Sequence, residues 1–213
     1  MTSLAELRKE YSKETLEVSS VSKDPIHQFE KWFDEALRTE VAEPNAMTLS
    51  TVTESGRPSA RIVLLKGIEN GKFLFSTNHQ SQKGKELESN PACALTFFWP
   101  ELERQVRIEG VSTRVDSAIA EKYFQSRPRG SQIGAWASPQ SSVISDRSLL
   151  EERVKELEKK FKDQELIPKP HQWGGYAVEP FEIEFWQGRP NRLHDRIAFY
   201  KAEDGWTLRR LAP

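Results

Sequence analysis

Apolar residues follow two different periods along this chain, and each period predicts a different kind of element. After Asp24, the apolar positions recur every three or four residues and share one helical face: Ile26, Phe29, Trp32, Phe33, Ala36 and Leu37. Pro25 stands at the first helical position, which is a favoured place for proline. The pattern then changes to short β-type segments at residues 47–53, 59–66, 72–77, 92–98 and 104–115. Tight turns join several of these segments, so the pattern predicts an antiparallel sheet or barrel.

Helical segments interrupt the predicted strands. We expect an amphipathic helix from Ser3 to Tyr11 and shorter helices at 81–88 and 116–126. Asp146 is expected to cap a longer helix that reaches Phe161 and carries an apolar stripe for the core or a subunit contact. Strands return after residue 175. The chain is therefore predicted to be an α+β protein with six or more antiparallel strands and packed helices, in one domain without a Pro/Gly/Ser-rich linker.

Composition excludes several classes of partner. The 213 residues carry a formal net charge of -1, which argues against nucleic-acid binding driven by bulk charge. Charged residues make up 30% of the chain, and no apolar run is long enough to span a membrane. Residues 1–20 lack the apolar core of a secretory signal. We therefore expect neither nucleic acid nor a membrane as a partner.

The cysteine and histidine positions point to a reducing compartment and to no metal. Cys93 is the only cysteine, so no intrachain disulfide can form, and a cytoplasmic location is expected. Its apolar neighbours indicate a buried strand residue rather than a nucleophile. The four histidines lie far apart in the sequence and show no spacing typical of metal ligands.

The most informative polar segment is Arg192-Leu193-His194-Asp195-Arg196, which β-type sequence flanks on both sides. If this segment is extended, Arg192, His194 and Arg196 project from one face and Asp195 from the other. Guanidinium groups match phosphate or carboxylate and stack on rings, and imidazole moves protons near neutral pH. The strip therefore predicts contact with a planar anion, and a solvated strand face is the alternative.

Three further segments are candidates for anion binding. Arg61 and Lys66 bound an apolar strand and would point to opposite faces; taken alone, the segment favours strand ends that simply reach solvent. Ser81-Gln82-Lys83 begins a predicted helix, where backbone N–H groups favour an anion. Tyr123, Arg127 and Ser131 follow at four-residue spacing, and Pro128 suggests that they converge around a bend rather than along one helix.

Taken together, these segments resemble the pyridoxine/pyridoxamine 5′-phosphate oxidase family of FMN-binding split barrels, from about Leu7 to Pro213. The most specific matches are Arg61-Ile62-Val63-Leu64-Leu65-Lys66, Tyr123-Phe124 through Ser126-Arg127-Pro128-Arg129, Ser131-Gln132-Ile133-Gly134-Ala135-Trp136, Glu184-Phe185-Trp186-Gln187-Gly188, Arg192-Leu193-His194-Asp195-Arg196 and Arg210-Leu211-Ala212-Pro213. Several long matches in the right order are far more specific than any one motif.

The resemblance implies an FMN-dependent homodimer with the flavin at the subunit interface, which oxidises pyridoxine and pyridoxamine 5′-phosphates to pyridoxal 5′-phosphate and reduces O2 to H2O2. Residues 1–20 would be a flexible N-terminal helix or lid, and residues 21–213 a single split-barrel domain. The implied FMN contacts are Arg61, Ile62, Val63, Leu64, Leu65, Lys66, Ser76, Thr77, Gln82, Lys83, Gln105, Gln140, Ser141, Trp186 and Arg196. The implied substrate contacts are Arg8, Tyr11, Lys66, Tyr123, Arg127, Ser131, Arg192 and His194, of which Arg192 and His194 would be catalytic.

The chain departs from the family pattern at two positions. Gln82 stands where the family commonly has arginine, and Ser76 stands where it often has an aromatic residue. Gln82 would therefore offer the flavin phosphate only a neutral donor. Two other functions stay open on sequence alone: another split-barrel flavoprotein such as a flavin reductase, and a non-catalytic carrier of flavin or pyridoxal phosphate.

Overall fold

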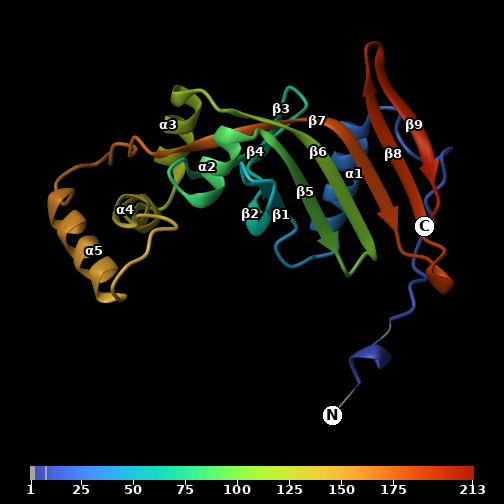
Figure 1. Ribbon diagram of the computed structural model, residues 1–213, viewed down its shortest axis with the longest axis horizontal. Helices are drawn as coiled ribbons and strands as arrows, with labels where there is room; N and C mark the ends of the chain where they lie inside the picture. Colours follow the sequence, from blue (N-terminus) through green and yellow to red (C-terminus); the bar gives the residue numbers. More distant parts are fainter. Residues whose placement is uncertain (1–2, 8) are drawn as a thin grey trace. The chain divides into compact units, whose positions relative to one another are not determined.

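The computed structural model describes residues 3–7 and 9–213 (Figure 1). Its helices are η1 (Leu4–Glu6), α1 (Pro25–Arg38), α2 (Gln82–Ser89), α3 (Ser117–Ser126), α4 (Arg129–Ala137), α5 (Ser148–Lys160) and η2 (Pro190–Arg192). Its strands are β1 (Ala46–Val52), β2 (Pro58–Leu64), β3 (Gly67–Glu69), β4 (Lys72–Asn78), β5 (Ala92–Trp99), β6 (Arg104–Arg114), β7 (Trp173–Gln187), β8 (Asp195–Ala202) and β9 (Gly205–Leu211). No helix in this described part combines the length and the apolar character needed to cross a membrane.

The strands form a nine-stranded sheet in the order β2-β1-β5-β6-β7-β4-β3, and β8 pairs with β7 and with β9. The pairs β3–β4, β4–β7, β7–β8 and β8–β9 are antiparallel. The longest strand is β7. Near its start, Tyr176 pairs with Phe75 of β4, and near its end, Trp186 pairs with Arg196 of β8. The predicted antiparallel sheet of six or more strands with packed helices is thus confirmed.

The chain forms two compact units. Unit 1 contains residues 1–49, 94–110 and 180–213, and unit 2 contains residues 50–93 and 111–179. Each unit is built from segments that are far apart in the sequence. The single domain expected for residues 21–213 stays a prediction.

The core of unit 1 lies under helix α1. Asp24 caps the helix by accepting a hydrogen bond from the Ile26 backbone N–H at 2.9 Å, which fits the predicted start. Phe29 and Trp32 are almost fully buried. The Phe29 ring lies 5.0 Å from that of Phe97, and the Trp32 ring lies 5.2 Å from that of Phe185. Phe29, Trp32 and Ala36 of the predicted apolar face are therefore the residues that pack, whereas Leu37 is 52% exposed.

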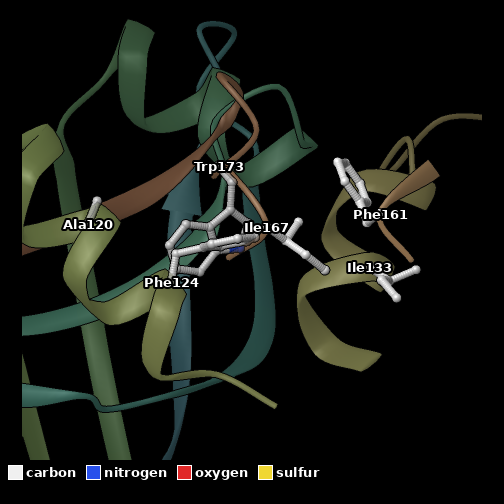
Figure 2. Packing of buried hydrophobic residues seen from close by; sticks show 6 residues of the cluster. All are labelled: Ala120, Phe124, Ile133, Phe161, Ile167 and Trp173. Carbon is white, nitrogen blue, oxygen red and sulfur yellow. The ribbon is translucent and has the colours of Figure 1, made fainter. Parts of the chain in front are cut away.

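Unit 2 has its own core around Trp173, at the start of β7 (Figure 2). The buried members of this cluster come from α3, α4, the end of α5 and the segment before β7: Ala120, Phe124, Ile133, Phe161, Ile167 and Trp173. Val154 and Leu157 of α5 pack against them, which confirms that the predicted apolar stripe of this helix meets the core.

Cys93 is buried in β5, with 8% of its surface exposed. Burial raises the pKa of its thiol to about 12, because the thiolate is poorly solvated there. The thiol is thus neutral near pH 7, as expected for a structural residue rather than a nucleophile.

Two local predictions were wrong. The helix expected from Ser3 to Tyr11 is only the short turn η1, Leu4–Glu6. The segment after Pro190 is not extended, because Asn191 and Arg192 have φ values of 55° and 62° and form η2. Strand β8 begins only at Asp195, so simple alternation does not place Arg192, His194 and Arg196 on one strand face.

Candidate functional site

Unit 2 contains a cavity of about 650 Å³ beside the α3–α4 junction. Strands β2 and β4, the start of α2 and the two helices supply its walls. The lining residues are Ile62, Val63, Leu64, Lys66, Ser76, Thr77, Asn78, Lys83, Tyr123, Arg127, Pro128, Ser131, Gly134, Ala135, Ser138, Gln140 and Trp173. The volume lies within the range typical of small-molecule sites, roughly 300–1,000 Å³.

The set Tyr123, Arg127 and Ser131 converges on this cavity, as the sequence predicted. Helix α3 ends at Ser126 and α4 begins at Arg129, so Pro128 separates two helices instead of interrupting one. Arg127 occupies the corner between them. Tyr123 on α3, Arg127 at the corner and Ser131 on α4 therefore all line the cavity.

Arg127 is the clearest anion-binding group of the cavity. Its Cζ lies 4.9 Å from the centroid of the Trp173 ring, and its Nη1 is buried without a hydrogen-bond partner among the described residues. Burial lowers the pKa of the guanidinium, although arginine stays charged near neutral pH. A buried donor without a partner is costly, and a phosphate oxygen would satisfy it.

Two lysines add positive charge to the same cavity. The Lys66 ammonium lies 5.8 Å from the centroid of the Tyr123 ring. Lys83 lies in the first turn of α2, after Ser81, whose hydroxyl accepts a hydrogen bond from the Gly84 backbone N–H at 3.3 Å. The pKa of Lys83 is lowered by burial and then by the nearby Arg61 cation. A bound anion would favour the charged form of Lys83 and so act against both of these causes.

Arg61 is held by protein acceptors in unit 2. Its Nη2 donates to the Glu86 carboxylate at 3.0 Å and to the Ser59 hydroxyl at 2.6 Å, and its Nη1 donates to the Thr51 hydroxyl. The cavity is lined by its neighbours Ile62, Val63 and Leu64 and not by Arg61 itself, while Leu65 is 7% exposed. Strand β2 ends at Leu64, so Lys66 lies beyond the strand and the predicted alternation between Arg61 and Lys66 does not apply.

Gln82 also binds Glu86. Its Nε2 donates to Glu86 Oε1 at 2.8 Å and lies 3.3 Å from the Ser59 hydroxyl. Glu86 is 5% exposed. Burial alone would raise the pKa of its carboxyl group, but hydrogen bonds from Thr51, Gln82 and Arg61 outweigh burial and hold the pKa below its ordinary value. Gln82 is thus absent from the cavity lining, and its contact with FMN stays a prediction.

The end of β4 contributes polar groups to the cavity. Thr77 Oγ1 lies 3.3 Å from Gln140 Oε1, which also accepts from the Asn78 backbone N–H at 3.4 Å. Ser76 lines the cavity beside Thr77. Ser141 is exposed, has a φ of 69° and is not a lining residue, so the structure does not bring it to this cavity.

Unit 1 holds a second group of the predicted residues. The rings of Trp186 and His194 lie 4.5 Å apart, and Tyr11 lies edge-on to Trp186 at 5.8 Å. Gln105 is half-buried near the start of β6. Arg8, which the resemblance implies as a substrate contact, lies outside the described residues.

Arg196 is fixed by a buried carboxylate. Its Nε and Nη2 donate to the two oxygens of Glu184 at 2.7 and 3.0 Å, and Arg107 donates to the same carboxylate at 3.2 Å. Glu184 is 3% exposed. This two-pronged pair holds the guanidinium in a defined plane, which the sequence did not reveal.

A backbone hydrogen bond determines which nitrogen of the neutral His194 ring carries the proton. Its Nδ1 accepts a hydrogen bond from the Arg189 backbone N–H at 3.1 Å, so the neutral ring carries its proton on Nε2. Burial and then the Arg192 cation lower its pKa. Asp195 instead accepts hydrogen bonds from the Leu16 backbone N–H and the Arg210 side chain.

Several residues of these sites escaped the sequence reasoning. Trp173, Asn78 and Ser138 line the cavity, and Glu86 and Glu184 hold the two arginines. No local signal identifies them as site residues. Trp173, Glu86 and Glu184 contact arginines that are 46, 25 and 12 residues away, and side-chain periodicity does not predict contacts over such separations.

The described residues fit FMN and a phosphorylated substrate on chemical grounds. Lys66, Lys83 and Arg127 supply cations to one cavity, and Arg127 Nη1 is a buried donor without a partner in the described part of the chain. Hydroxyl and amide groups of Ser76, Thr77 and Gln140 supply further hydrogen bonds. A phosphate ester fits this combination, because its oxygens accept charge-assisted hydrogen bonds from arginine and lysine.

Comparison with known proteins gives full-length matches. The family model described as "Pyridoxamine 5'-phosphate oxidase" matches residues 33–161, and "Pyridoxine 5'-phosphate oxidase C-terminal dimerisation region" matches residues 173–213. The pyridoxine/pyridoxamine 5′-phosphate oxidase of Salinibacter ruber is 53% identical over 215 residues, with 100% of both chains covered. A protein of the same name from Leptospira interrogans is 54% identical over 211 residues, covering 99% of this chain and 98% of that protein.

Solved structures show the same fold. PhzG from Burkholderia lata, in complex with tetrahydrophenazine-1-carboxylic acid, superposes with a TM-score of 0.89 at 28% identity, covering 96% of this chain and 100% of PhzG. A pyridoxamine 5′-phosphate oxidase-related, FMN-binding protein from Nostoc punctiforme has a TM-score of 0.69 at 16% identity, covering 87% of this chain and 97% of that chain. The predicted split-barrel fold is therefore confirmed.

Proposed function

The chain belongs to the pyridoxamine 5′-phosphate oxidase family, and from this premise we propose that it oxidises pyridoxine 5′-phosphate and pyridoxamine 5′-phosphate to pyridoxal 5′-phosphate. FMN is its cofactor, and O2 is the electron acceptor and becomes H2O2. The substrate loses a hydride from its 4′ carbon and a proton from the attached oxygen or nitrogen; with the amine substrate, water then hydrolyses the resulting imine and ammonia leaves. Bound FMN supplies the two-electron redox chemistry between substrate and O2.

The observation that carries this proposal is the cationic cavity at the α3–α4 junction. Arg127 presents a buried Nη1 that finds no hydrogen-bond partner in the described part of the chain, and Tyr123, Ser131 and Lys66 line the same space. These four residues would hold the substrate phosphate. Positioning of this kind lowers barriers by roughly 7–11 kcal/mol in favourable cases, because the reacting carbon is held in place before the reaction.

Other residues would hold FMN. Arg61 and Lys83 supply positive charge for its phosphate, with Gln82 beside them, and Ser76, Thr77 and Gln140 supply hydrogen bonds. Residues 62–65, Ser141, Gln105, Trp186 and Arg196 complete the proposed set. Glu184 supports this assignment of Arg196, because it fixes the plane of the guanidinium, whose Nη1 donates to the Ala212 carbonyl at 2.9 Å.

Arg192 and His194 are the proposed catalytic residues. Arg192 is exposed and held by a turn with positive φ, so its guanidinium is available to orient the substrate ring and stabilise negative charge. His194 would carry the accompanying proton at Nε2, because its Nδ1 already accepts the Arg189 N–H. Tyr11 and Arg8 would cover the substrate from the N-terminal segment.

The match to the dimerisation region supports a homodimer. We propose that FMN binds at the interface between the subunits, in agreement with the family pattern. We also propose that the protein is cytoplasmic, because its single buried cysteine forms no intrachain disulfide and therefore needs no oxidising compartment.

An anaerobic titration tests the proposed function. The purified protein should be yellow, with one FMN per subunit, and pyridoxine 5′-phosphate added without O2 should bleach the flavin absorbance. Readmission of O2 should restore the colour and release H2O2. A flavin reductase would be bleached by a nicotinamide cofactor instead, and a carrier would bind the phosphate ester without bleaching; either result would refute the proposal.

A further inference from the structure

The N-terminal segment Tyr11–Glu17, here called the strap, has no helix or strand but is tied closely to unit 1. Leu16 is 3% exposed, its backbone N–H donates to Asp195 at 3.1 Å, and its carbonyl accepts from Arg210 at 2.9 Å. In Figure 1 this blue segment passes beside the end of β9. These contacts fix the C-terminal half of the strap but not its beginning.

The side chain of Glu103 holds the beginning of the strap. Its Oε2 accepts hydrogen bonds from the backbone N–H groups of Ser12 at 2.9 Å and Lys13 at 3.1 Å. The side chain is only 3% exposed. A buried carboxylate is costly without partners, and these two N–H groups come from residues 91 and 90 positions away in the chain. Glu103 therefore depends on the strap, and the strap on Glu103.

The backbone of Glu103 is also constrained. Its φ is 55°, a region that side-chain-bearing residues rarely adopt, and its carbonyl accepts from the Gly188 N–H at 2.7 Å. The same residue thus joins the strap to the segment that follows Trp186. This connection relates Glu103 to the aromatic group of unit 1.

The captured N–H groups come directly after Tyr11. The Tyr11 ring lies edge-on to Trp186 at 5.8 Å and 6.1 Å from the His194 ring. A Cβ added at Gly188 would lie 2.7 Å from both Cβ and Cγ of Tyr11, so only glycine allows this close approach. The position of Tyr11 is therefore set by Glu103 on one side and by Gly188 on the other.

We propose that Glu103 is a positioning residue of the oxidase: it captures the Ser12 and Lys13 amides and thereby seats Tyr11 against Trp186 and His194 for contact with the substrate. The substrate part rests on the proposed function. The seating of Tyr11 itself does not, because it stands on contacts within unit 1.

The test uses the full-length holoenzyme and two variants that disturb the seat from opposite sides. Glu103→Gln removes the charge and keeps the size, and Gly188→Ala displaces Tyr11 while leaving the Glu103 hydrogen-bond acceptors in place. Glu101→Gln is the matched control, because it removes the same charge two residues away, and the Lys13 ammonium donates to the Glu101 backbone oxygen, which this change keeps.

The first readout is amide hydrogen exchange. In Glu103→Gln, exchange of the Ser12 and Lys13 amides should speed up by about tenfold, since the loss of a charge-assisted hydrogen bond favours local opening. Glu101→Gln should leave it unchanged. Unchanged exchange in Glu103→Gln would overturn the proposal, whatever the enzyme acts on.

The second readout is kinetic. Both Glu103→Gln and Gly188→Ala should raise KM for pyridoxine 5′-phosphate several-fold with little change in kcat, and Glu103→Gln should add nothing further in a Tyr11→Ala background. Additive losses in that double variant would show that Glu103 is merely structural and overturn the proposal. Faster exchange without any KM change would refute its substrate part alone. A wild-type protein without oxidase activity would refute the proposed function, and the exchange result would still stand.

Discussion

The guanidinium of Arg127 lies over the indole ring of Trp173, with Cζ 4.9 Å from the ring centroid. Its Cζ is also 5.6 Å from the centroid of the Phe124 ring. Because aromatic faces hold the plane of the guanidinium, its N–H edge is left for a ligand, and Nη1 has no partner among the described residues. An arginine held in this way is suited to a phosphate at the wall of the cavity.

Arg127→Ala should raise KM for pyridoxine 5′-phosphate by about 10- to 100-fold and change kcat little. The loss corresponds to roughly 1.5–3 kcal/mol for a charge-assisted hydrogen bond, and phosphate binding is similar in the ground and transition states. Steady-state kinetics of the holoenzyme measure both constants. Lys122→Ala, an exposed cation on α3, the helix that ends just before Arg127, is the control and should behave like the wild type.

The same assignment predicts that unphosphorylated pyridoxine is a very poor substrate. Equal kcat/KM with and without the phosphate would remove Arg127, Tyr123 and Ser131 from the substrate site.

Arg192→Leu should lower kcat strongly while FMN stays bound, because Arg196 and its Glu184 partner are unchanged. His194→Ala should lower kcat less and change the pH profile on its acidic side, since burial and Arg192 place the pKa of His194 below its ordinary value. His171→Ala, at an exposed histidine, is the control. A wild-type kcat in Arg192→Leu would show that this arginine only faces solvent.

Gln82→Arg should tighten FMN binding by up to about tenfold, or roughly 1.4 kcal/mol, because it adds a cation near Lys83 and Arg61. The gain should shrink at high salt. Fluorescence titration of the apoprotein measures it, and Gln80→Arg, an exposed position with the same change in charge, is the control.

The Glu86 carboxylate would compete with the flavin phosphate for an arginine at position 82. Gln82 donates to Glu86, so an arginine at this position that pairs fully with Glu86 would leave FMN affinity unchanged. That result would assign Gln82 to the support of Arg61 and not to the flavin phosphate.

Thermal stability should fall as the pH drops below about 6.5. Burial, followed by the Arg114 and Lys169 cations, lowers the pKa of His79 in the folded protein, while Glu88 acts in the opposite direction. The unfolded chain therefore takes up the proton first. The contribution of His79 is complete above its ordinary pKa and is lost as the pH falls toward the lowered one; His194 acts in the same direction.

Melting temperatures of the holoenzyme between about pH 5 and pH 8 test this linkage. His79→Gln should flatten the acidic side of the curve, whereas His27→Gln, at an exposed histidine, should not. A curve of the same slope in wild type and His79→Gln would mean that other groups carry the pH dependence.

Local pattern was enough for much of the fold. The apolar face of residues 25–38, the cap at Asp24, the burial of Cys93 and the bend at Pro128 all depend on residues within a few positions of one another. Side-chain period, capping and the missing proline N–H act over the same short range, so the sequence alone determined these features and, with them, the convergence of Tyr123, Arg127 and Ser131.

The tertiary structure decided what the sequence could not. Alternation failed at Arg192 because Asn191 and Arg192 adopt positive φ, which no periodic pattern encodes. The carboxylates that hold the arginines, Glu86 at Arg61 and Glu184 at Arg196, are 25 and 12 residues away from their partners. Glu103 reaches the strap across about ninety residues. Such pairs form only when packing brings distant segments together. A buried carboxylate is unfavourable unless it is hydrogen-bonded, and the tertiary structure decides which donors lie beside it.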